Sequence, residues 1–392
     1  MVFRGSNAST GAQLVALTVT STGTYRPGMS RPDSNAMADA PAVSIITPTY
    51  NHAAFLPACI ESVLGQTFPS WEQIIIDDGS TDDTSQVIER SRDPRIQYVR
   101  QDHRGIDHLA ETYNRALALC RAPLIAILEG DDYWPADKLE VLLPAFDDDE
   151  VVLAYGVTET VVETRCTVAP VIPTPDFMRV FPSGTLTNNP IGTATMAMLD
   201  CRGLTFTYPC SVILRRRALE RIGGFAQRPG LPVTDYPTFL RLSLEGRFHF
   251  ENRTMGYWRA HRDSITVRRT DEIHAAVYRD ILRFRDELGA RLQISEDAWR
   301  PIEQHWRVVN GAIAMRRARQ LLLQARWREA RRDLVRALGS APSQTRFMAL
   351  TGLLLSYLGL PIEWIYRRAG RAWFMRRDAG TFELIAPTSR PR

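Results

Sequence analysis

An apolar run that ends abruptly in carboxylates is the feature of this sequence that most constrains its fold. Residues 124–128 read Leu-Ile-Ala-Ile-Leu, which is typical of a strand buried on both faces of a sheet. Glu129, Asp131 and Asp132 follow at once, around Gly130. Neighbouring carboxylates repel one another, and each is costly to remove from water without a partner. A divalent cation that prefers oxygen ligands, Mg²⁺ or Mn²⁺, would compensate them.

The position of these carboxylates after a buried strand gives a second reason to expect a site. Ligands of open α/β sheets bind just beyond the carboxyl ends of the strands. Residues 124–134 therefore predict a metal and ligand site. The alternative that this stretch leaves open is a solvated acidic cluster before a helix over residues 135–146.

Strands alternate with helices over the first third of the chain. The strands are expected at residues 43–47, 72–76, 96–100 and 124–128. The helices are expected at residues 53–64, 84–90 and 107–120. Because short polar turns join these elements, the pattern predicts an α/β fold with a doubly wound, mostly parallel sheet flanked by helices.

Two earlier turns should bring polar side chains to the same edge of the sheet as the carboxylates. They are residues 47–51 after the first strand and residues 77–82 after the second. Asp77 and Asp78 favour contact with a ribose hydroxyl or a base, whereas the rest of that turn is expected to cap the next helix. Neither GxGxxG nor GxxxxGK[ST] occurs, which excludes a dinucleotide fingerprint and a P-loop.

Taken in order, several segments resemble a family 2 glycosyltransferase of the GT-A fold. They are VSIITPTYN (43–51), ESVLGQTF (61–68), IIIDDGSTDDT (74–84), IAILEGDDYWPADKLE (125–140), LRRRALERIGGF (214–225), DYPTFLRL (235–242) and YWRAHRDSIT (257–266). The resemblance implies an inverting transferase that takes a sugar from a nucleotide-sugar donor, with UDP the expected nucleotide and Mn²⁺ or Mg²⁺ as cofactor. The acceptor is expected to be a glycan or a lipid-linked hydroxyl in bacterial surface-polysaccharide synthesis.

The resemblance also implies roles for individual residues. Asp235 is expected to be the catalytic base, and Asp131 and His261 the metal ligands. The nucleotide sugar is expected to contact Pro48, Tyr50, Asn51, Asp77, Asp78, Arg104, Glu129, Gly130 and Asp132. In an inverting displacement a carboxylate removes the acceptor proton on one face of the sugar, while the nucleoside diphosphate leaves from the other.

Three positions depart from the family pattern. Glu129 stands where Asp is usual, Tyr113 where Arg is usual, and Thr234 where Glu is usual. These departures keep open a catalytically degenerate protein that only binds nucleotide sugars. A nucleotidyltransferase is a further alternative, although the glycine-rich basic loop such enzymes carry after the first strand is missing from PTYNHAAF (48–55).

The sequence divides into three expected regions: a disordered extension over 1–40, the transferase domain over 41–267 and a helical region over 268–392. Residues 300–392 hold 18 arginines and 6 acidic residues. Within them, residues 347–362 carry no charge but are short for a membrane span of about 20 residues. We therefore expect peripheral membrane contact through residues 347–377, a cytoplasmic location on the inner-membrane face, and no nucleic-acid partner.

Overall fold

The computed structural model describes residues 40–163, 183–200, 207–292, 294–340 and 343–359. The disorder expected for residues 1–40 falls, except for Ala40, outside the described residues. The same holds for residues 360–377 of the expected membrane-contact segment.

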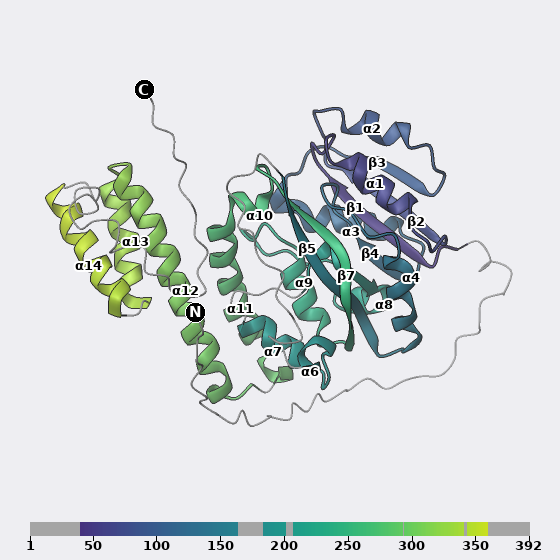
Figure 1. Ribbon diagram of the computed structural model, residues 1–392. Helices are drawn as coiled ribbons and strands as arrows, with labels where there is room; N and C mark the ends of the chain where they lie inside the picture. The colour runs from purple at the N-terminus through teal and green to yellow at the C-terminus, as the bar shows by residue number, and fades with distance from the viewer. Residues whose placement is uncertain (1–39, 164–182, 201–206, 293, 341–342, 360–392) are drawn as a thin grey trace, which may run out of the picture.

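A seven-stranded mixed sheet forms the centre of the protein (Figure 1). Its strands are β1 (Val43–Thr49), β2 (Trp71–Asp77), β3 (Ile96–Arg100), β4 (Leu124–Ile127), β5 (Val151–Val162), β6 (Val212–Arg215) and β7 (Arg247–Ala260). The spatial order is β3-β2-β1-β4-β6-β5-β7. All neighbours are parallel except β6, which is antiparallel to both β4 and β5. The predicted mostly parallel α/β sheet is confirmed.

Helices cover both faces of the sheet. One core contains apolar residues of α1 (Leu56–Leu64), α2 (Thr84–Arg90) and α4 (Lys138–Leu142). The other face is covered by α3 (Leu109–Leu119), α7 (Thr193–Asp200), α8 (Arg216–Arg221), α9 (Asp235–Leu242), α11 (Thr270–Leu292) and the first half of α12 (Glu296–Leu323). Shorter elements are η1 (Ile106–His108), η2 (Leu143–Asp147), α6 (Ser183–Thr187), η3 (Pro209–Ser211) and α10 (Ile265–Arg268).

The register of the central strands sets the position of the site. Thr49 of β1 pairs with Asp77 of β2, and Ile46 pairs with Ile127 of β4. The chain after β4 stays beside β1, because the Gly130 backbone N–H donates to the Pro48 carbonyl at 3.1 Å. The turns after all three strands therefore meet at one edge of the sheet, as the sequence predicted.

Two long strands were not predicted. They are β5, which extends from Val151 to Val162, and β7, which extends from Arg247 to Ala260. The outer half of β5 and much of β7 are only partly buried. β7 and the outer half of β5 consequently lack the continuous apolar run that made β1, β2 and β4 recognisable, whereas residues 151–155 of β5 carry such a run.

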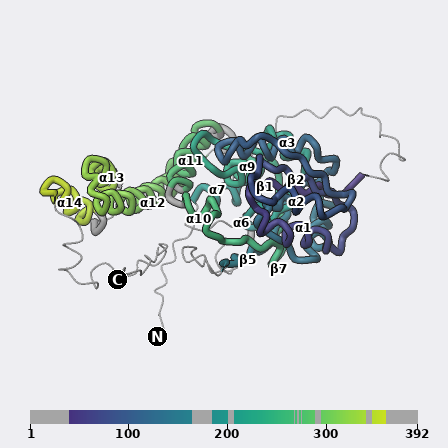
Figure 2. Tube along the Cα trace, turned by 90° about the horizontal axis from the view of Figure 1, so that it is seen from above, coloured from purple at the N-terminus to yellow at the C-terminus, as the bar shows by residue number. Residues whose placement is uncertain are grey.

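A helical extension follows the sheet. The large core continues past residue 267 into α11 and α12, where Trp306 Nε1 donates to the Leu199 carbonyl at 2.8 Å. A separate cluster begins at Ala314 and joins α12 to α13 (Trp327–Ser340) and α14 (Ser343–Leu358). Figure 2 shows α12 leading away from the sheet with α13 and α14 at its far end. Among the described helices, none has the length and apolar character needed to cross a bilayer.

Candidate active site

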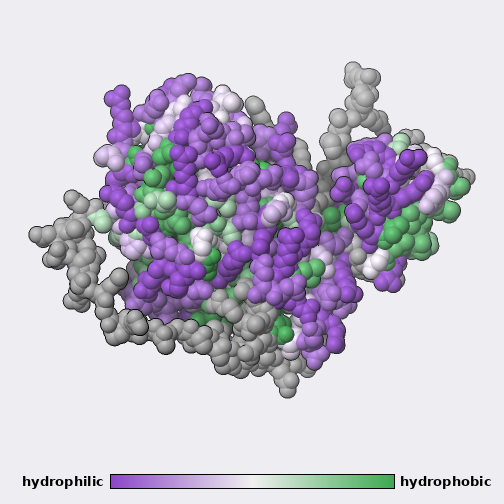
Figure 3. Space-filling view, turned by 180° about the vertical axis from the view of Figure 1, so that it is seen from behind, coloured by the Kyte–Doolittle hydropathy of each residue, from purple (hydrophilic) through white to green (hydrophobic). Residues whose placement is uncertain are grey.

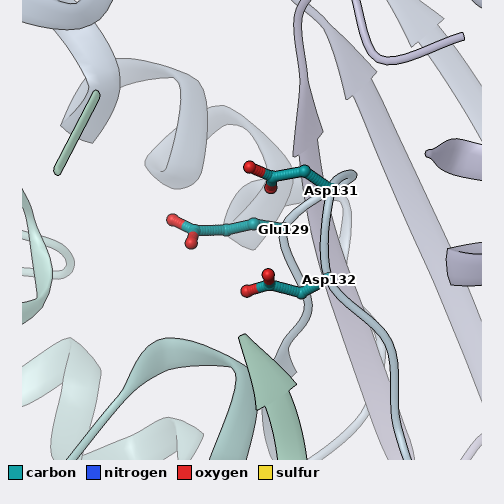
Figure 4. Close-up of side chains that lie close together, drawn as sticks. All are labelled: Glu129, Asp131 and Asp132. Atoms are coloured by element: carbon teal, nitrogen blue, oxygen red, sulfur yellow. The ribbon is translucent and has the colours of Figure 1, made fainter. Parts of the chain in front are cut away.

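Three carboxylates converge where β4 ends. Glu129, Asp131 and Asp132 each offer an oxygen, and these atoms lie within 4.8 Å of one another. Figure 4 shows the three side chains side by side and pointing the same way. The strand positions them, because Leu128 still donates to the Ile46 carbonyl at 3.0 Å before the chain turns. The cluster is thus built on the core of the sheet.

Glu129 is held by a residue that departs from the family pattern. The Tyr113 hydroxyl, on α3, donates to Glu129 Oε1 at 2.7 Å. Burial, followed by the charge of Asp131, raises the pKa of Glu129 to about 8. Glu129 is one methylene longer than the usual Asp, and Tyr113 occupies the usual Arg position. The two departures therefore meet in one hydrogen bond, a pairing that the sequence reading did not foresee.

Asp131 is paired with His261 at the end of β7. Its Oδ2 lies 3.0 Å from His261 Nε2, and His261 is 6% exposed. The Asp263 backbone N–H donates to His261 Nδ1 at 3.3 Å, so Nε2 carries the ring proton and donates to Asp131. Burial raises the pKa of Asp131, but the neighbouring His52 and His261 outweigh it and lower that pKa overall. The metal-ligand role of His261 stays a prediction.

Asp132 has an oxygen available for a ligand. The Arg259 backbone N–H donates to its Oδ1 at 2.9 Å. Its Oδ2 is buried and has no hydrogen-bond partner among the described residues. Burial and the neighbouring Asp131 and Glu129 raise the pKa of Asp132 well above its usual range. A buried orphan oxygen within an all-oxygen cluster fits a hard divalent cation such as Mg²⁺ or Mn²⁺.

The chain's single lysine lies behind this cluster. Lys138 is fully buried, its Nζ donates to the Cys210 carbonyl at 2.6 Å, and it sits 3.9 Å from the Trp134 ring centroid. Burial lowers the pKa of Lys138 well below its usual range, whereas Asp132 acts in the opposite direction. The sequence carries one signal for this residue, because 47 of the 48 basic residues are arginine.

We expect the metal-free protein to lose stability as pH rises from about 4.5 to about 8. In that interval folded Glu129 keeps its proton, whereas in the unfolded chain it ionises near its ordinary pKa of 4.5. The folded state then binds more protons, so raising the pH favours unfolding. Urea unfolding in a chelator at a series of pH values measures the slope.

Glu129→Gln is the matched variant for this prediction, because it keeps the shape and removes the titration. Its stability should depend less steeply on pH, with the remaining slope coming from groups such as Asp132. Equal slopes for the two proteins would contradict the raised pKa of Glu129.

Asp77 and Asp78 shape the second turn of the site. Asp77 is fully buried, and its oxygens accept from the Ser80 backbone N–H at 2.8 Å and the Tyr98 hydroxyl at 2.9 Å. Asp78 accepts from the Gly105 backbone N–H at 2.9 Å and from Gln101 Nε2 at 2.7 Å. Asp77 thus holds the turn through both oxygens, and the ligand contact predicted for it stays a prediction.

Exposed rings border that turn. Tyr50 stacks on His103 with ring centroids 4.2 Å apart, and Tyr50 is 38% exposed. Gly79 has φ +74°, and a Cβ there would lie 2.7 Å from the His103 backbone nitrogen, so only glycine allows this approach. The predicted donor contact Arg104 directs its guanidinium to Glu111 instead. His103 was missed by the sequence reading, which had no motif to mark it.

The remaining donor residues lie in or beside β1. Pro48 is buried in the strand, and Asn51 accepts from the Thr81 backbone N–H at 2.8 Å, which ties the first turn to the second. A Cβ on Gly130 would meet Thr49 Oγ1 at 2.6 Å and His52 Nδ1 at 2.9 Å. Gly130 is therefore needed for close packing, a structural reason that the resemblance did not supply.

Asp235 enters the same region from a distant segment. It is the first residue of α9 and is half-buried, and the preceding Thr234 forms no side-chain cap. Burial raises the pKa of Asp235 above its usual 3.8. Its charge in turn raises the pKa of both Glu129 and Tyr113, which places it close to the acidic cluster. The structure thus brings together the groups that the sequence separates by about a hundred positions.

The acidic cluster lies beyond the carboxyl end of a strand in a mostly parallel α/β sheet, which is where such sheets bind their ligands. Comparison with known proteins identifies the domain that carries it. Residues 44–223 match the family described as "Glycosyl transferase family 2". Residues 44–223 therefore form a family 2 glycosyltransferase domain.

Two relatives and one solved structure illustrate the similarity. A chondroitin synthase of Pasteurella multocida is 29% identical over 59% of this chain and 22% of its own length. An Escherichia coli protein, UDP-Glc:alpha-D-GlcNAc-diphosphoundecaprenol beta-1,3-glucosyltransferase WfaP, is 35% identical over 29% of this chain and 45% of its own. The crystal structure of S. aureus TarS aligns with a TM-score of 0.49 and 18% identity, over 81% of this chain and 53% of TarS. The chain thus matches less than half the length of either relative.

Proposed function

We propose that this glycosyltransferase moves a sugar from a nucleoside-diphosphate donor, with UDP as the nucleotide, to a hydroxyl of a glycan or lipid-linked acceptor with inversion. The observation that carries the proposal is the carboxylate cluster at the end of β4, together with Asp235 beside it. A cluster with one buried orphan oxygen supports a bound Mg²⁺ or Mn²⁺, held by Asp131 and Asp132 with Glu129 alongside.

The donor's nucleoside is assigned to the edge formed by the first two turns. Tyr50 offers an exposed ring face for a base, and Asn51 lies beside it at the surface. Asp77 and Asp78 act indirectly, by fixing the loops that present these groups. The diphosphate would then extend along the end of β1 towards Asp131.

The chemistry follows from the separation of charges across the site. When bound, the divalent ion neutralises charge that grows on the leaving diphosphate. His261 fixes the orientation of Asp131 through its Nε2–H, and Tyr113 fixes Glu129. Asp235, from α9, takes the proton of the acceptor hydroxyl as that oxygen attacks the anomeric carbon. Its raised pKa makes it a stronger base than an exposed aspartate.

The acceptor assignment rests on the relatives. The printed name of the E. coli relative specifies a UDP-sugar donor and a diphosphoundecaprenol-linked acceptor. We assign the present chain a related class of acceptor and a cytoplasmic location, where nucleotide sugars are made available to membrane-linked substrates.

The proposal is tested by thermal unfolding with UDP, GDP, TDP and CDP, each with and without Mn²⁺. A ligand at about 100 times its dissociation constant adds about 2.7 kcal/mol to the free energy of unfolding, which is a clear shift in melting temperature. We expect UDP to give the largest shift, and only with the metal. A shift for another nucleotide would change the donor assignment, and no shift for any nucleotide would contradict a donor site at this edge.

A further inference from the structure

An apolar stripe runs along the outer side of α14. Phe347, Leu350, Leu354, Tyr357 and Leu358 are between 56% and 70% exposed. Their spacing of three and four residues places them on one side of the helix. Figure 3 shows hydrophobic surface gathered at this end of the protein. A contiguous apolar patch exposed on a protein surface usually marks an interaction site.

The opposite side of α14 is fully used in packing. Ala349 and Leu355 are buried in the cluster shared with α12 and α13. A Cβ on Gly352 would meet Leu334 Cδ2 at 2.9 Å, so the two helices are in close contact. The stripe therefore cannot turn inwards without breaking this contact, and α14 presents it as a fixed surface.

Positive charge borders the stripe. The Arg331 guanidinium lies 4.0 Å from the Tyr357 ring centroid, and its NH2 group donates to the Ser356 carbonyl at 2.7 Å. Arg346 is exposed directly before Phe347. From residue 334 to residue 362 the sequence contains no aspartate or glutamate, and five arginines follow within 367–377. An apolar face bordered by cations complements an anionic lipid surface.

We propose that the α14 stripe docks the enzyme on an anionic lipid surface. Leu350 and Leu354 enter the acyl boundary, Tyr357 lies at headgroup level, and Arg331 and Arg346 contact lipid phosphates. This would hold the sheet domain near a lipid-linked acceptor without a membrane-spanning helix. The docking is independent of which nucleotide the active site takes.

The test is co-sedimentation of the full-length protein with vesicles of phosphatidylcholine alone or mixed with phosphatidylglycerol, at low and high salt. We expect binding to the anionic vesicles only, weakened by salt. The double variant Leu350→Ser/Leu354→Ser should lower binding at least tenfold, and Arg346→Glu should lower it severalfold. Val308→Ser, which removes another exposed apolar side chain from α12 well before the α14 contact, should bind as the unchanged protein does.

Circular dichroism melts establish that each variant is folded, and transfer to a water-soluble acceptor should be unchanged. Folded protein that ignores anionic vesicles overturns the proposal. So does binding that the double leucine variant leaves intact. A concentration-dependent dimer that the leucine variant dissociates, in protein that does not bind vesicles, would assign the stripe to a second copy of the chain and likewise overturn it.

Discussion

Replacing Asp131 by asparagine should abolish metal-dependent donor binding and lower the transfer rate about a thousandfold, or ~4 kcal/mol in activation free energy. Asparagine keeps an oxygen that can accept from His261 Nε2, so the local hydrogen bond survives. It removes the central charge of the cluster, and with it the attraction for a divalent ion. Isothermal titration of Mn²⁺ and UDP, together with a transfer assay, measures both effects.

The same substitution should slightly destabilise the metal-free protein. Asp131 repels the charges of Glu129 and Asp132 and raises the pKa of both. The attraction of His52 and His261 nevertheless lowers the pKa of Asp131 overall, so the folded state favours its charge, and removing that charge should lower the melting temperature in a chelator. Asp297→Asn, an exposed carboxylate at the start of α12, is the matched control and should change neither binding nor rate. Metal-dependent donor binding that persists in Asp131→Asn would refute the assignment of this cluster.

The sequence predicted the centre of the fold because buried parallel strands leave a simple signal. The apolar runs at β1, β2 and β4 are interrupted by few polar residues, and polar turns mark their ends. β7 and the outer half of β5 lack this signal, and their position is set by tertiary pairing with each other. The sequence of a strand does not indicate its neighbouring strand when that neighbour lies about a hundred residues away, as β7 does from β5.

The candidate site divides along the same line. Residues that follow a recognisable strand, such as Asp131, were predicted with their position at the sheet edge. Tyr113, His52 and His103 were missed as site residues, because each acquires its partner only when α3 or a loop folds over the strand ends. The donor contact of Asp77 stays a prediction, since a carboxylate that follows a strand can also bind its own turn, as Asp77 does here.

Replacing Asp235 by asparagine should leave metal-dependent donor binding intact and lower the transfer rate by a factor of about 10²–10⁴, which is the usual contribution of a general base. The side chain keeps its size at the first position of α9. Burial raises the pKa of Asp235, so the folded state disfavours its charge, and loss of that charge should not reduce stability. Donor affinity by titration and single-turnover transfer rates separate the two effects.

The pH dependence of transfer distinguishes a base from a residue that only supports the helix. Asp235 must be ionised to accept a proton, and burial raises its pKa above 3.8. The plot of transfer rate against pH should therefore have an acidic limb, in which the rate falls as the pH drops towards this raised pKa. Asp235→Asn should lack the limb, whereas Asp235→Glu should retain it and recover part of the rate. If the asparagine variant kept this fall in rate at low pH, another group would have to accept the proton. Glu129, whose pKa is raised by burial and by nearby carboxylates, would then be the next residue to test.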